Sequence, residues 1–171
     1  MAEARWRRTI RVVRRARWPA TAPPPCGGDR VHDRLPLTRN TDLMLELVRI
    51  TSYPSGLAVQ LALTATGRPA RRAWHETRPL TDPTDLSAHW SYLEVWAGSG
   101  DLAAADPYFP RPDLQAAASG ICSYRSEPLY WLPTAPAWAL TLATGWPQIG
   151  LPTAVTTMHL DPITPPTSRR A

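Results

Sequence analysis

Twenty prolines divide this chain of 171 residues into short apolar segments, and their spacing limits the folds that the chain can adopt. A proline lacks a backbone hydrogen-bond donor and disrupts the interior of a helix, so an all-helical protein of this length would not tolerate so many. The prolines fall between apolar segments, which is typical of short strands joined by turns. Hydrophobic residues make up 43% of the chain. That is enough for a core, so we expect one folded domain.

The strongest local pattern predicts a β-hairpin. Apolar side chains alternate with polar or small ones over residues 42–50 and again over 57–64, as in strands that bury one face. Between them lies Tyr53-Pro54-Ser55-Gly56, where proline presets φ and glycine can supply a positive φ. We expect these two segments to pair around that turn.

The rest of the chain predicts more strands and no helix in the body. Residues 65–88 are polar and contain Pro69, Pro79 and Pro83, which favours turns. Further strands are expected over residues 89–97, 101–105, 129–132, 138–143 and 154–160. About seven strands with frequent turns indicate an all-β protein, a single antiparallel β-sandwich. We place the sandwich at residues 37–164, after a basic, Pro/Gly-rich arm and linker (1–36) and before a polar tail (165–171).

Several segments of the body resemble uncharacterised actinobacterial β-sandwich proteins of unknown function. The matching segments are Tyr53 to Leu57, the strand Leu93-Glu94-Val95 with its glycine turn, Tyr130 to Pro133, and Trp146 to Pro152. The resemblance covers roughly residues 40–165. The chain departs from the pattern of those proteins at Ser119-Gly120, where a longer glycine-rich stretch would be expected. The resemblance implies the fold and no chemistry.

The charge of the chain lies in its first twenty residues. That segment carries +6, whereas the remaining residues carry −1. Its arginines are Arg5, Arg7, Arg8, Arg11, Arg14, Arg15 and Arg17. Three interpretations stay open: the arm binds the phosphate backbone of nucleic acid, it lies on an anionic membrane as an amphipathic helix over residues 5–18, or it is untranslated or has no partner.

Arginine usage also bears on origin and chemistry. Nineteen arginines and no lysine indicate a GC-rich genome such as that of an actinobacterium. The chain therefore has no lysine side chain for a Schiff base or for a Walker A phosphate loop. We find neither a segment of about 20 apolar residues nor a secretory signal, so we expect a soluble, cytoplasmic protein. Cys26 and Cys122 are then expected as unpaired thiols, although a disulfide between them is conceivable.

The candidates for enzymatic chemistry are few. His75, Glu76, Asp82, Asp85 and His89 form the densest group of metal-ligating residue types, which makes a metal-dependent enzyme around His75 and His89 one alternative. No nucleophile motif or cofactor-binding loop accompanies them. We therefore expect a protein that is not an enzyme and holds no cofactor or metal.

The segment 89–97 contains the best candidate for a binding surface. Trp90, Tyr92 and Trp96 share one side of this strand with Glu94. Because an unpaired carboxylate is costly in a core, that side should face outward and offer aromatic rings to a sugar or a protein surface. The alternative is that these rings fill the core or lie under the loop 106–127. Trp131, Trp138 and Trp146 are expected to pack in the core or against turns. The leading hypothesis is a small non-enzymatic interaction module of unknown partner.

Overall fold

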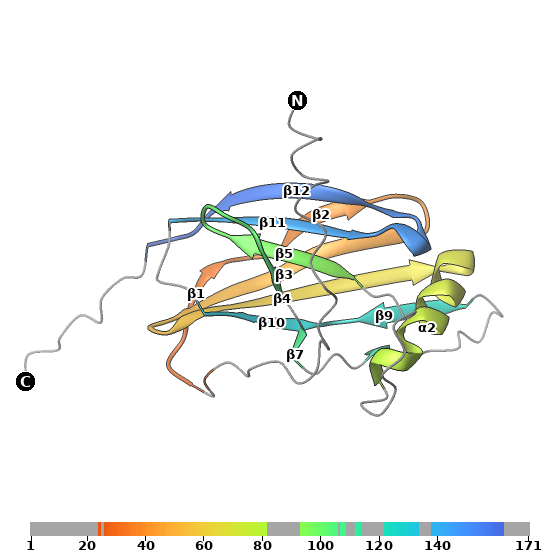
Figure 1. Cartoon of the computed structure of the whole chain (residues 1–171), viewed down its shortest axis with the longest axis horizontal. Coiled ribbons are helices and arrows are strands. Elements are labelled where there is room, and N and C mark those ends of the chain that lie inside the picture. Colours follow the sequence, from red (N-terminus) through yellow and green to blue (C-terminus); the bar gives the residue numbers. More distant parts are fainter. Residues whose placement is uncertain are drawn as a thin grey trace, which may run out of the picture.

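The computed structural model describes residues 24, 26–81, 93–105, 107–108, 112–113, 122–133 and 138–162. In these residues two antiparallel sheets pack against each other, and one α-helix lies at an end of the pair (Figure 1). The prediction of an all-β sandwich is confirmed.

The first sheet, sheet A, is built around two long central strands, β3 (Leu43–Tyr53) and β4 (Gly56–Thr66). The shorter strands of this sheet are β1 (Asp29–His32), β2 (Leu35–Arg39), β7 (Pro107–Tyr108), β8 (Pro112–Asp113), β9 (Ser123–Ser126) and β10 (Leu129–Leu132). Strands β1 and β2 both pair with β3, whereas β9 and β10 both pair with β4. Strand β7 adds to β10, and β8 adds to β9.

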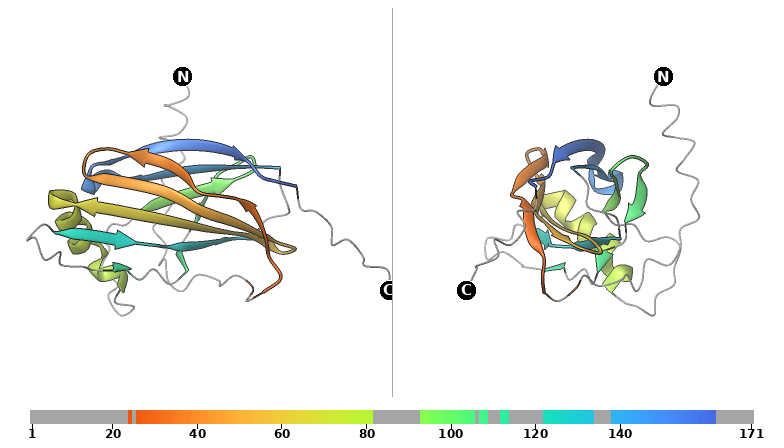
Figure 2. Two further views of the ribbon diagram at one scale, coloured as in Figure 1. Left: turned by 180° about the vertical axis from the view of Figure 1, so that it is seen from behind. Right: turned by 90° about the vertical axis from the view of Figure 1, so that its left-hand side faces the viewer.

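The second sheet, sheet B, has the order β12-β11-β5-β6. Its strands are β5 (Glu94–Gly98), β6 (Ala103–Ala105), β11 (Ala139–Trp146) and β12 (Leu151–His159). A short 3₁₀ turn, η1 (Pro147–Ile149), joins β11 to β12. Viewed end-on, the two sheets curve around a common interior (Figure 2).

The predicted hairpin is confirmed as β3 and β4, joined by Pro54 and Ser55. Its pairing contains one irregularity that the alternation did not predict. Leu47 pairs with Leu61 but Arg49 pairs with Gln60, so Val48 is an extra residue in β3. Beyond such a bulge, residues that would have pointed to one face of the sheet point to the other. The buried positions accordingly change from Leu43, Leu45 and Leu47 to Ile50 and Ser52.

The N-terminal edge of sheet A differs from the sequence interpretation. Residues 29–36 were assigned to a linker, but β1 and the start of β2 lie there. Val31 is 3% exposed, and its carbonyl accepts a hydrogen bond of 2.8 Å from the backbone N–H of Asp161. Both strands contain register shifts against β3, which is why they show no regular alternation.

A second difference is the helix α2 (Gly67–Thr81), which falls where only turns were predicted. Pro69 lies in the first turn of α2, where a backbone N–H has no acceptor within the helix. A proline at this position therefore costs no helical hydrogen bond. Ala70 and Ala73 are fully buried in the same core as the strands, so α2 closes one end of the sandwich (Figure 1). The sequence prediction failed because a two-alanine contact gives a weak apolar pattern among polar residues.

Sheet B contains a bulge of its own beside Gly145. Thr144 pairs with Ala154 but Trp146 pairs with Leu151, so β12 has one extra residue around Pro152 and Thr153. A Cβ atom on Gly145 would lie 2.8 Å from the Cα of Thr153. Glycine is therefore required for the close approach of the two backbones, and the bulge accommodates a proline that cannot donate to the ladder.

Candidate functional site

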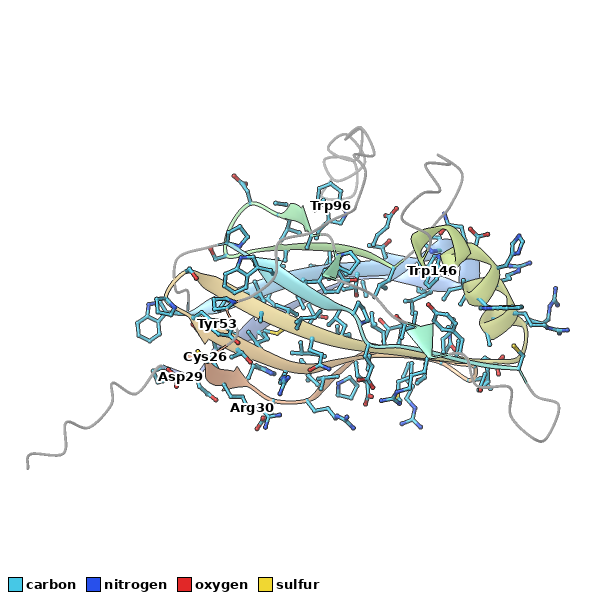
Figure 3. All side chains as sticks on the ribbon, turned by 90° about the horizontal axis from the view of Figure 1, so that it is seen from below. Cys26, Asp29, Arg30, Tyr53, Trp96 and Trp146 are labelled. Atoms are coloured by element: carbon cyan, nitrogen blue, oxygen red, sulfur yellow. The ribbon has the colours of Figure 1, made fainter. Side chains whose placement is uncertain are left out.

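The side chains of strand β5 alternate between the core and the other side of sheet B. Leu93, Val95 and Ala97 are buried at 1%, 2% and 5% exposure. Glu94 and Trp96 alternate with them and are half-buried on the opposite, outer side. Figure 3 shows the Trp96 ring projecting away from the sheets. Trp90 and Tyr92 lie outside the described residues, so their place in a binding surface stays a prediction.

The register of sheet B places Trp96 in the middle of an apolar row. Ala143 of β11 lies directly opposite Trp96 on one side, and Ala104 of β6 lies opposite it on the other. Val155 of β12 is the next residue in the row and is 60% exposed. Residues that lie opposite each other in adjacent antiparallel strands share a face. We refer to Ala104, Trp96, Ala143 and Val155 as the Trp96 row.

Small and hydroxylic residues lie on either side of this row. Thr141 and Thr157 form the next pair along β11 and β12, and their hydroxyl oxygens lie 2.9 Å apart. Gly98 continues that line on β5. On the other side Gly145 lies opposite Glu94. Among the described residues, the outer side of sheet B therefore carries one large aromatic ring and a neighbouring carboxylate among small and hydroxylic residues, of which Ala143 and Gly145 are buried.

Helix α2 provides a different surface at one end of the sandwich. Arg68, Arg71, Arg72 and His75 are all exposed on the side opposite the buried alanines. Trp74, which flanks them, is 53% exposed. Sequence reasoning missed this surface because it missed the helix. The spacing Arg68-Arg71-Arg72-His75 is the signal that could have revealed it.

A third group of aromatic residues lies at the opposite end. Tyr53 and Trp131 pack edge to face, with ring centroids 5.7 Å apart and planes at 72°. A Cβ atom on Gly28 would lie 2.5 Å from the Tyr53 ring. The backbone before β1 therefore packs directly on that ring. Both aromatic side chains are half-buried, and we assign them a structural role.

The predictions for the remaining tryptophans have different outcomes. Trp146 is fully buried, and its ring contacts Tyr124 edge to face with centroids 6.3 Å apart, so the core prediction is confirmed. Trp131 packs against Tyr53 at the hairpin turn, as expected. Trp138 is 75% exposed, so the expectation that it packs was wrong. It directly precedes β11, and its carbonyl accepts a hydrogen bond of 2.9 Å from the backbone N–H of Leu160.

The metal and thiol candidates can be placed only in part. His75 and Glu76 belong to α2, whereas Asp82, Asp85 and His89 lie outside the described residues. Within the described ranges no group of three or more His, Cys, Asp or Glu side chains could hold a metal ion.

Cys26 and Cys122 are both free thiols. Cys26 precedes the segment that packs on Tyr53, and Figure 3 shows the two close together. The carbonyl of Cys122 accepts a hydrogen bond from Gly67 at the far end of β4. The eleven residues of β4 span about 33 Å, so a disulfide between the two thiols is ruled out.

Comparison with known proteins adds no identification. The sequence matches no protein-family model, and searches of curated proteins and of solved structures found no match. None of the helices in the described ranges is long and apolar enough to cross a membrane. Assignment of function therefore depends on the surfaces described above.

The Arg-rich segment 1–20 lies outside the described residues, so its proposed binding of nucleic acid remains a prediction from sequence.

Proposed function

We propose that this protein is a non-enzymatic interaction module that binds another protein through the outer face of sheet B. The observation that supports the proposal is the position of Trp96, on the outer side of a strand whose alternate residues Val95 and Ala97 fill the core. Tryptophan is among the residues that contribute most to protein interfaces, because its ring buries a large area with few rotatable bonds.

The neighbours of Trp96 favour a flat contact over a pocket. The rest of the Trp96 row consists of two alanines and Val155, and the rows beside it contain glycine and threonine. Ala143 is only 1% exposed, so the apolar area open to a partner comes from Val155, from Ala104 and from the exposed part of Trp96. Threonine hydroxyls at the margin can exchange hydrogen bonds with the partner or with water. This arrangement resembles the apolar centre and polar rim of a protein interface.

Site-specific photo-crosslinking in cells tests this proposal. A photoreactive phenylalanine analogue at Val155 should give one defined adduct, and Trp96→Ala should remove that adduct. The matched control is the same analogue at Arg49, which is exposed on sheet A. Thermal unfolding of Trp96→Ala must be measured in parallel, because loss of the adduct counts only if the variant stays folded.

Two results would contradict the proposal. An adduct at position 155 that survives Trp96→Ala would show that Trp96 takes no part in binding. The same adduct from position 49 would show that the capture does not depend on sheet B. If Trp96→Ala unfolds the protein, Ala104→Glu provides a second substitution in the row that leaves the analogue at position 155 in place, at a side chain that is already exposed.

A further inference from the structure

The exposed side of α2 has a regular basic pattern. Arg68, Arg71, Arg72 and His75 follow i, i+3, i+4 and i+7 spacing, so their side chains form one stripe along the helix. From Arg68 to His75 the stripe extends about 10 Å along the helix axis. The buried residues of this helix, Ala70 and Ala73, lie on the other side and belong to the core.

Two ion pairs in the described part of the chain lie outside this stripe, although Glu76 of the same helix follows Arg72 at i+4 spacing. These pairs join Arg30 to Asp33 and Arg125 to Glu127. Arg72 donates a hydrogen bond of 3.4 Å to the backbone carbonyl of Gln148, which anchors α2 to η1. Like charges at i, i+3 and i+4 spacing destabilise a helix. The stripe thus opposes the stability of α2 and is complementary to an anionic partner.

We propose that this side of α2 binds the phosphate backbone of single-stranded nucleic acid. Arginine forms bidentate hydrogen bonds with phosphate oxygens, and three such residues in one stripe can contact neighbouring phosphates of a strand. Trp74 flanks the stripe and is 53% exposed. An exposed aromatic ring beside a row of cations is the arrangement on which an unpaired base stacks.

The same residues argue against a membrane surface as the partner. A helix that lies on a bilayer inserts a wide apolar side into the lipid. In α2 the apolar side, with Ala70 and Ala73, is already buried against the sheets. Among the described side chains of α2, Trp74 alone could insert. This site contains no residue of the Trp96 row or of the segment 1–20, and it does not depend on the proposed function.

Fluorescence anisotropy with the full-length chain tests the site. The probe is a fluorescein-labelled oligothymidylate of about 16 nucleotides, titrated at several salt concentrations. For a single strand, each phosphate contact makes the slope of log K against log salt more negative by about 0.7. The triple variant R68Q/R71Q/R72Q should therefore reduce the magnitude of that slope by about 2. Glutamine keeps a good helix propensity. Because R72Q also removes the bond to Gln148, the double variant R68Q/R71Q, which keeps that bond, should reduce the magnitude of the slope by about 1.4.

Two further variants make the test specific. The triple variant R34Q/R39Q/R49Q removes three exposed arginines outside α2 and thus the same net charge, and it should leave the slope nearly unchanged. Trp74→Ala should weaken binding by about fivefold or more at constant salt, because stacking on that base is lost, while the slope stays the same.

The proposal is overturned if the two triple variants lower the slope equally, since binding would then follow net charge alone. It is also overturned if neither the α2 triple variant nor Trp74→Ala changes binding, which would assign any affinity to other residues. Vesicles of anionic phospholipid serve as the competing surface. If they bind the protein through the α2 arginines and excess oligothymidylate does not displace them, the partner is a membrane.

Discussion

Replacing two tryptophans on opposite sides of sheet B tests the structural basis of the proposed binding surface. Trp146 of β11 is fully buried, whereas Trp96 of the adjacent strand β5 is half-buried on the outside. Figure 3 shows both rings. The same substitution to alanine at both positions should therefore have very different effects on the free energy of unfolding.

The expected magnitude follows from burial. A fully buried tryptophan removes about 150–250 Å² from water, which corresponds to about 4–6 kcal/mol at about 25 cal/mol per Å². Measured losses for large aromatic residues replaced by alanine in cores are about 3–5 kcal/mol. The edge-to-face contact of Trp146 with Tyr124 is lost as well. We expect Trp146→Ala to cost about 4 kcal/mol and Trp96→Ala about 1 kcal/mol.

Urea unfolding followed by far-UV circular dichroism measures both values without relying on tryptophan fluorescence. With a slope of about 2 kcal/mol per M, Trp146→Ala should lower the urea midpoint by about 2 M and Trp96→Ala by about 0.5 M. Trp146→Phe is the matched control and should fall between them, because it keeps an apolar ring in the core. Equal losses for the two alanine variants would refute the reasoning, since Trp96 would then be a core residue and the outer face of sheet B would have no aromatic anchor.

Three further predictions concern backbone packing and the thiols. Gly145→Ala should destabilise the protein by about 1–3 kcal/mol because its Cβ would overlap Thr153, whereas Gly100→Ala, with nothing within 4 Å, should change stability by less than about 0.5 kcal/mol in the same urea assay. A chain that starts at Leu37 should unfold at a lower temperature than one that starts at Pro24, because it lacks β1 and the buried Val31; equal midpoints would show that β1 contributes nothing. In the native protein Cys26, which is exposed, should react rapidly with a thiol reagent and Cys122, which is half-buried, slowly, so Cys26→Ser should remove the fast phase.

The central hairpin and the two sides of β5 could be predicted because each rests on a strong physical constraint. Alternating apolar residues on either side of Pro54 and Gly56 leave one pairing that buries both strands. Glu94 favours the observed orientation of β5, since a carboxylate would be costly on the core side. For the hairpin the sequence itself contains the residues that exclude the alternative, whereas for β5 it left open whether the aromatic rings face outward, fill the core or lie under the loop 106–127.

The features that were missed depend on contacts between distant segments. β1 contributes one fully buried residue, Val31, and its place is determined by β3 and by the backbone bond to Asp161. α2 is held by two alanines and by the carbonyl of Gln148, far along the chain. The spacing of the arginines was the local signal for this helix, but it competed with Pro69, Pro79 and a polar composition that favour turns. A surface on a short helix is therefore harder to predict than one on a strand whose neighbours alternate regularly.

The charge distribution gives the arginine stripe a role beyond its local contacts. Residues 21–171 hold twelve arginines and thirteen acidic residues, a net charge of −1, so without Arg68, Arg71 and Arg72 this segment would carry −4. α2, which lies at one end of the sandwich (Figure 1), is therefore a positive region in a segment whose other residues carry a net negative charge. A polyanion would be attracted to that end and repelled by the rest of the body, so the charges favour an approach with α2 leading. Neutralising the stripe should thus lower the association rate at low salt more than at high salt, whereas Trp74→Ala should act mainly on the dissociation rate.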